Sequence, residues 1–190
     1  MDEIKVSILI CSYAARRKLL TDCIDSIKRT VKDYKYELLV NVESEPTGLE
    51  NTPSRYQKLW EKSTGEYIVK ADSDIWFFPG WLEEGLETLE SGLFSYVGML
   101  DTVVESLGFK DHYIPMPYYP MRQLKYNEDL RLVAGGVWFF RRDLWKQVPY
   151  DGGKYTKSLD TNFGIRVIRK LGKNPGYTRW ILASHMGVHE

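Results

Sequence analysis

An apolar, β-prone run over residues 67–71 ends in two carboxylates one residue apart, Asp72 and Asp74. In an open α/β sheet, ligands bind outside the carboxyl ends of the strands. The run therefore predicts a strand that carries paired negative charge to the rim of a crevice. A hard divalent ion can neutralise such a pair and also hold a substrate diphosphate. Taken alone, such a pair is a weak motif and more often marks a solvated corner between a strand and a loop.

Strand-like and helix-like segments alternate around this run. Apolar runs predict further strands at residues 6–11, 36–42, 94–100, 131–141 and 177–184. Apolar residues at helical spacing predict helices over residues 19–27, 53–60, 81–89 and 158–171, with a short helical segment at 143–148. This alternation predicts an α/β fold with a mainly parallel central sheet and helices on both faces.

The length and composition of the chain exclude several classes of protein. The 190 residues suffice for one domain with a sizeable core. The net charge is zero and no basic tract is present, which argues against nucleic-acid binding and against a polybasic membrane anchor. The chain shows neither a signal-peptide layout nor an apolar stretch long enough to span a bilayer. Cys11 and Cys23 lack zinc-site or disulfide spacing. We therefore expect a cytoplasmic protein with reduced cysteines in its core.

Two segments depart from the alternation. Residues 101–130 are rich in proline and tyrosine and show no periodicity. A loop of this length is usually functional, although an aromatic flap over the core fits the composition as well. The pair Gly135 and Gly136 interrupts a predicted strand, which indicates a bulge or a close approach of a ligand or another backbone.

Six short motifs follow one another in a recognisable order. They are the first strand with Ser12-Tyr13 at its end, the second strand at 36–40, Thr64-Gly65-Glu66-Tyr67-Ile68 before Asp72-Ser73-Asp74, the glycine and arginine pairs within 134–142, Asp160 at a helix start, and His185-Met186-Gly187. In this order the chain resembles the GT-A-fold glycosyltransferases of the family-2 kind almost from end to end.

The departures from the family pattern lie in four places. Ala14 follows Tyr13, whereas the family continues its first turn with asparagine. Leu159 precedes Asp160, whereas the family has a second acidic residue directly before its catalytic aspartate. Glu43 stands near the position of an aspartate that holds the nucleotide base. The chain also ends soon after His185, so it is either a minimal enzyme or one domain of a longer protein.

The resemblance implies a single GT-A (Rossmann-like) domain over residues 1–190. About residues 1–100 would bind the nucleotide sugar, and about residues 101–190 would bind the acceptor and carry the catalytic residue. The implied reaction is a metal-dependent, inverting transfer from a nucleoside diphosphate sugar, a UDP-sugar in our prediction. The acceptor would be a hydroxyl of a glycan, a glycoprotein or a lipid-linked molecule.

The resemblance also implies the site residues. Asp74 and His185 would bind the metal, and Asp72 would lie between the ribose and the ion. His189 is an alternative metal ligand, whereas His112 is not expected to bind the metal. An imidazole ligand favours Mn²⁺, with Mg²⁺ next. The residues expected to bind the nucleotide sugar are Ser12, Tyr13, Glu43, Arg55, Asp72, Ser73 and Gly136.

The expected general base is Asp160, which would take the proton of the acceptor hydroxyl. An aspartate in the first turn of a helix also simply complements the helix dipole. Trp76 and Trp138 could present flat faces to a sugar ring, although tryptophan is more often part of a core. A solvated Arg55 is likewise as compatible with the sequence as one that binds phosphate.

Two other classes of function stay open at this point. A sugar-phosphate nucleotidyltransferase has a similar fold, but it usually carries a glycine-rich loop after the first strand. Residues 11–15 contain no glycine, although Arg16-Arg17-Lys18 follow them. The other hypothesis is a non-catalytic nucleotide- or carbohydrate-binding module. The presence of Asp72, Asp74, Asp160 and His185 argues against it.

Overall fold

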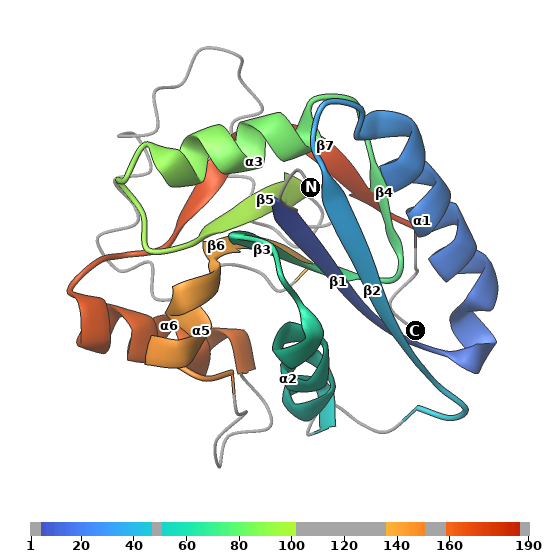
Figure 1. Cartoon of the computed structure of the whole chain (residues 1–190), viewed down its shortest axis with the longest axis horizontal. Helices are drawn as coiled ribbons and strands as arrows, with labels where there is room; N and C mark the ends of the chain where they lie inside the picture. Colours follow the sequence, from blue (N-terminus) through green and yellow to red (C-terminus); the bar gives the residue numbers. More distant parts are fainter. Residues whose placement is uncertain (1–4, 47–50, 102–135, 151–158, 187–190) are drawn as a thin grey trace.

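The computed structural model describes residues 5–46, 51–101, 136–150 and 159–186. Within these ranges seven strands form one sheet in the order β2-β1-β3-β6-β5-β7-β4 (Figure 1). The strands are β1 (Val6–Tyr13), β2 (Tyr36–Glu43), β3 (Tyr67–Asp72), β4 (Ile75–Phe77), β5 (Val97–Asp101), β6 (Val137–Arg141) and β7 (Gly176–His185). Strands β1, β2, β3, β5 and β7 run in one direction, and β6 and β4 run against them.

Helices cover both faces of this sheet, as the sequence predicts. They are η1 (Ala14–Arg16), α1 (Arg17–Thr30), α2 (Thr52–Lys62), α3 (Trp81–Glu90), α5 (Arg142–Gln147) and α6 (Leu159–Leu171). Helices α1 and α3 pack on one face, and α2, α5 and α6 pack on the other (Figure 1). None of the helices in the described ranges is long and apolar enough to cross a bilayer.

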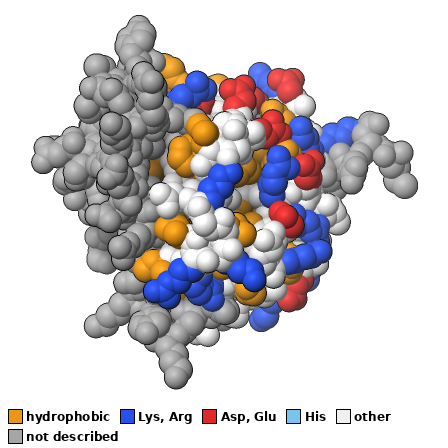
Figure 2. Space-filling view, turned by 90° about the vertical axis from the view of Figure 1, so that its left-hand side faces the viewer, with side chains coloured by type: hydrophobic (Ala, Val, Ile, Leu, Met, Phe, Trp, Pro, Cys, Tyr) orange, Lys and Arg blue, Asp and Glu red, His pale blue; other side chains and the backbone are white. Residues whose placement is uncertain are grey.

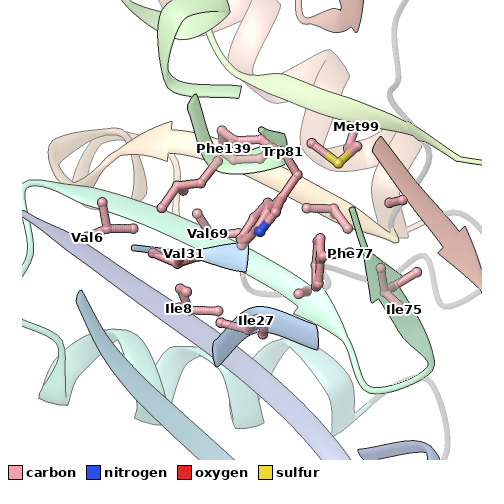
Figure 3. Packing of buried hydrophobic residues seen from close by; sticks show 14 of the residues in the cluster. Val6, Ile8, Ile27, Val31, Val69, Ile75, Phe77, Trp81, Met99 and Phe139 are labelled. Carbon is pink, nitrogen blue, oxygen red and sulfur yellow. The ribbon is translucent and has the colours of Figure 1, made fainter. Parts of the chain in front are cut away.

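The two-sided core follows from the alternation of side chains along each strand. In β1, Ile8 and Ile10 join the cluster beneath α1 and α3, and Leu9 joins the cluster beneath α2, α5 and α6. Figure 3 shows Trp81 of α3 at the centre of the cluster beneath α1 and α3. The centre of its ring lies 4.0 Å from the ring centre of Phe77. The strands are apolar on both faces because both faces are covered.

The surface carries mixed charge. On the face drawn in Figure 2, Lys and Arg side chains lie among Asp and Glu side chains, with hydrophobic side chains between them. This mixture agrees with the balance of 26 basic and 26 acidic residues over the whole chain.

The structure differs from the sequence prediction in three elements. Strand β6 is antiparallel to both of its neighbours, β3 and β5, which an apolar run cannot reveal because it carries no information on direction. The short strand β4 and the single turn η1 were not predicted. The loop at 102–130, the start of the predicted strand at 131–135 and the helix start at Ser158 lie outside the described residues.

A hydrogen-bond network at the start of β3 explains the glycine before it. The amide of Gly65 donates to Ser7 Oγ at 2.8 Å, and Ser7 Oγ donates to Glu37 Oε1 at 2.6 Å. The amide and hydroxyl of Thr64 donate to the same Glu37 oxygen. A Cβ on Gly65 would lie 2.7 Å from the Ser7 backbone nitrogen. Only glycine therefore lets this turn approach β1 closely enough to align the three parallel strands.

We predict that Glu37→Gln destabilises the fold in a pH-dependent way. Partial burial raises the pKa of Glu37, but the hydrogen bonds from Ser7, Thr64 and Gly65 outweigh it and hold the pKa below its ordinary value of 4.5. A carboxyl with a lowered pKa adds stability above its unfolded pKa and loses it as the pH falls through the folded one. The stability lost by the variant should be largest at neutral pH and shrink below about pH 4.5.

Urea denaturation across this pH range measures the difference. Glu45→Gln, at an exposed position just after β2, is the matched control and should follow the wild type at every pH. A deficit of Glu37→Gln that stays constant down to acid pH would contradict the network as described.

Candidate active site

The predicted binding residues converge at the carboxyl ends of three parallel strands. Tyr13 at the end of β1 pairs in register with Glu43 at the end of β2. On the other side of β1, Cys11 pairs with Asp72 at the end of β3. This edge is where an open α/β sheet binds its ligands. Segments far apart in the sequence therefore supply one continuous polar rim.

Asp72, Asp74 and His185 form a cluster at this edge. Strand β4 follows Asp74 directly and pairs antiparallel with β7, which sets Ile75 opposite His185. The amide of Met186 donates to the carbonyl of Asp74 at 2.7 Å. One ligand atom from each member of the cluster lies within 4.8 Å of the others. Two carboxylates and an imidazole at this spacing fit a divalent cation such as Mn²⁺.

Two cations that the sequence analysis did not single out lie against the acids. Arg16 Nη1 lies 2.8 Å from Asp74 Oδ2, and Lys70 Nζ lies 3.4 Å from Asp72 Oδ1. Lys70 stands two residues before Asp72 in β3, so both point to the same face of the strand. That spacing was visible in the sequence. The approach of Arg16 was not, because it depends on the η1 turn after β1.

Lys70 is almost completely buried beneath Asp72. Its side chain is 3% exposed, and its ammonium lies 4.8 Å from the ring centres of both Tyr56 and Trp138. Aromatic faces attract a desolvated cation. Trp138 is fully buried and stacks on Phe163 at 5.2 Å, so it belongs to the core and offers no face to a sugar.

Arg55 holds the ends of β1 and β2 together. It is 8% exposed, and its Nη2 donates to the Ser12 carbonyl. Its Nε lies 3.4 Å from Asn41 Oδ1 and 3.7 Å from Glu43 Oε1. Arg55 is therefore not a solvated arginine, and these contacts favour a supporting role beneath Ser12 and Glu43. The Ser12 hydroxyl itself is buried and has no hydrogen-bond partner among the described residues.

Gly136 and Ser73 lie beside the acid cluster. The carbonyl of Gly136, just before β6, accepts a hydrogen bond from the Asp72 amide at 2.8 Å. Ser73, between the two acids, is 3% exposed. Trp76, close behind them, has the guanidinium of Arg29 4.5 Å from its ring centre. One of its faces is therefore already in contact with a cation.

Asp160 is linked to the acid cluster through Tyr150. It stands in the first turn of α6, one turn before Phe163, which packs on Trp138. Burial raises the pKa of the Tyr150 hydroxyl, and the carboxylates of Asp160 and Asp72 raise it further. Both acids therefore lie within electrostatic reach of one phenol. His189, the alternative metal ligand, and His112 lie outside the described residues.

The two cysteines take no part in this polar edge as nucleophiles. Burial raises the pKa of Cys11 and of Cys23 to about 12, so both stay as neutral thiols near pH 7. Both are free, as the sequence predicts. The groups available for chemistry here are consequently the carboxylates, the imidazole and the neighbouring hydroxyls.

Comparison with known proteins identifies the family. The sequence profile of glycosyl transferase family 2 matches residues 53–148, just over half of the chain. The chain belongs to this family. The matched region contains the strand that ends in Asp72, the short strand after Asp74 and the strand after Gly136. No curated protein matches the sequence in a direct search.

Solved structures agree on the fold. A mannosyltransferase, PcManGT from Pyrobaculum calidifontis, in complex with GDP-Man and Mn²⁺, aligns over 100% of this chain and 59% of its own, with a TM-score of 0.67 and 15% identity. TarS from S. aureus, in a structure of residues 1–349, aligns over 96% of this chain and 60% of its own, with a TM-score of 0.67 and 10% identity. The family-2 chain thus has the GT-A fold and spans about three fifths of the length of these structures.

We predict that Arg55→Met destabilises the family-2 domain by about 2–3 kcal/mol, because it leaves the Ser12 carbonyl and the Glu43 carboxylate without their cation. Arg17→Met, at an exposed position of α1, should change the free energy of unfolding by less than about 0.5 kcal/mol. Urea denaturation of both variants measures the difference. Equal effects would contradict the supporting role of Arg55.

Proposed function

We propose that this chain transfers a sugar from a nucleoside diphosphate sugar to a hydroxyl acceptor, with inversion at the anomeric carbon. The observation that carries the proposal is the convergence of Asp72, Asp74 and His185 at the ligand-binding edge of a family-2 domain. The PcManGT complex with GDP-Man and Mn²⁺ supports the same class of donor and cofactor.

In this proposal Asp74 and His185 hold a divalent cation, with Asp72 between the cation and the ribose of the donor. The cation, Mn²⁺ or alternatively Mg²⁺, would neutralise the charge that builds on the departing diphosphate. Asp74 is suited to this role because it is 3% exposed and its carboxylate therefore needs a positive partner.

The nucleoside would lie along the ends of β1 and β2. Tyr13 is half-buried and offers a ring on which a base can stack, and Glu43 is its partner in register. The buried hydroxyl of Ser12 is available for a hydrogen bond to the donor. Ser73 and Gly136 complete the lining beside the acids, and Arg55 keeps the two strand ends in place from below.

Asp160 is the proposed general base. Its carboxylate would accept the proton of the acceptor hydroxyl while that oxygen forms a bond to the anomeric carbon. The bond from the anomeric carbon to the diphosphate breaks in the same step, and its electron pair leaves with the diphosphate. Attack and departure on opposite sides of the ring invert the configuration. The partial burial of Asp160 and its proximity to Tyr150 are consistent with this role.

The donor class can be tested by thermal shift with UDP-, GDP-, dTDP- and CMP-sugars, each with and without Mn²⁺. We expect one nucleotide class to raise the melting temperature, and to do so only with the metal, because a ligand that binds the folded state stabilises it. UDP-sugars are our first expectation, and GDP-sugars are the alternative. No shift with any donor would contradict the proposal.

Catalysis can be tested with Asp160→Asn and Asp74→Asn in an assay for released nucleoside diphosphate. Asp160→Asn should keep donor binding and lower turnover by about a hundredfold or more, since it removes the base but not the donor site. Asp74→Asn should lose the Mn²⁺-dependent thermal shift as well. Asp25→Asn, at an exposed position of α1, is the matched control. Release of pyrophosphate in place of a nucleoside diphosphate would instead indicate nucleotidyl transfer.

A further inference from the structure

Arg16 links the proposed nucleoside site to the acid cluster. It ends the η1 turn directly after β1. Its Nη1 lies 2.8 Å from Asp74 Oδ2, and its Nε donates to the Tyr13 hydroxyl at 2.7 Å. The side chain of Arg16 is 33% exposed, whereas that of Asp74 is 4% exposed. The guanidinium therefore reaches from the solvent side of the rim onto a buried carboxylate.

This ion pair gives Asp74 the positive partner that its burial demands. The oxygen that Arg16 occupies belongs to the carboxylate of the candidate metal cluster. A guanidinium at 2.8 Å from that oxygen and a divalent cation bound to the same carboxylate would repel each other strongly at this depth. Binding of a cation by Asp74 and binding of Arg16 by Asp74 are therefore in competition.

The released guanidinium would find an anionic partner at the same place. A diphosphate held at Asp74 by the cation would lie near the η1 turn from which Arg16 extends. The planar fork of arginine matches phosphate oxygens with two parallel hydrogen bonds. Its long side chain is one third exposed and extends from the short η1 turn, so it could turn towards a phosphate without movement of the sheet.

We propose that Arg16 is a diphosphate-binding residue that Asp74 holds as a counterion until a divalent cation takes its place. The proposal rests on the function proposed above. It gives Arg16 two roles of opposite sign: it weakens the binding of the metal alone, and it strengthens the binding of the nucleoside diphosphate once the metal is bound. A purely structural arginine would not produce this opposition.

The first arm of the test uses Mn²⁺ alone and the full chain, with the signal of free Mn²⁺ followed by electron paramagnetic resonance. Arg16→Gln should bind Mn²⁺ about tenfold more tightly than the wild type, because it removes a charged competitor. Arg17→Gln removes the same charge at the next, exposed position and controls for the general effect of charge. Unchanged or weaker Mn²⁺ binding by Arg16→Gln, relative to Arg17→Gln, would overturn the proposal.

The second arm measures the affinity for UDP and GDP by calorimetry at saturating Mn²⁺. Arg16→Gln should bind the preferred nucleotide about tenfold more weakly than the wild type, and Arg17→Gln should bind it as the wild type does. Equal affinity of Arg16→Gln and the wild type would overturn this inference alone. A wild type that binds Mn²⁺ but neither nucleotide would overturn the proposed function with it.

A second variant keeps the test decisive if Arg16→Gln does not fold. Arg16→Lys retains the charge that competes for Asp74 but lacks the planar fork. It should bind Mn²⁺ about as the wild type does and still bind the nucleoside diphosphate more weakly. Wild-type affinity for both ligands would show that the fork has no part in binding the diphosphate and would overturn the proposal.

Discussion

The crowding of negative charge at one edge of the sheet is the constraint to which the neighbouring structure is fitted. Asp72 and Asp74 leave β3 one residue apart, and the β4–β7 pairing adds His185 from the far end of the chain. Like charges at this distance are stable only beside positive charge. The structure meets this demand with Arg16 on Asp74 and with Lys70 beneath Asp72. The acids are thus held in place by cations that each come from a different element.

Two charged side chains hold the ends of the parallel strands together. Arg55 ties the carboxyl end of β1 to β2, and at the opposite, amino ends of the strands Glu37 ties the turn before β3 to β1 and β2. Both use a charged side chain with several partners rather than apolar packing, because they lie where the sheet gives way to loops. Charge-assisted hydrogen bonds are directional, so they fix the relative positions of strand ends that hydrophobic contact alone would leave free to shift. Of these bonds, the contacts of Arg55 lie at the rim where we propose that the donor binds.

The sequence predicts the layers of helices and sheet in this fold well, but it predicts the directions of the strands less well. Apolar runs and helical spacing suffice to place the helices on both faces and the strand that ends in Asp72. They cannot show that β6 runs antiparallel, because side-chain alternation is the same in either direction. In the site, motif order predicts that Asp74 and His185 meet, and the structure brings them together. Arg16 was missed because its ion pair with Asp74 joins residues far apart in the sequence and depends on tertiary geometry. Lys70 stands only two residues before Asp72, so its place on the same face of the strand could have been predicted from the sequence.

Lys70 also connects two parts of the molecule that the motifs treat as separate. Phe163 of α6 stacks on Trp138, the Trp138 ring lies under the Lys70 ammonium, and Lys70 contacts Asp72. A continuous series of contacts between rings and charges thus joins the helix that carries Asp160 to the strand that carries Asp72. The proposed acceptor side and the proposed donor side of the domain are therefore connected through packed side chains. A tilt of α6 would shift Phe163 and, through its stack on Trp138, change the surroundings of Asp72.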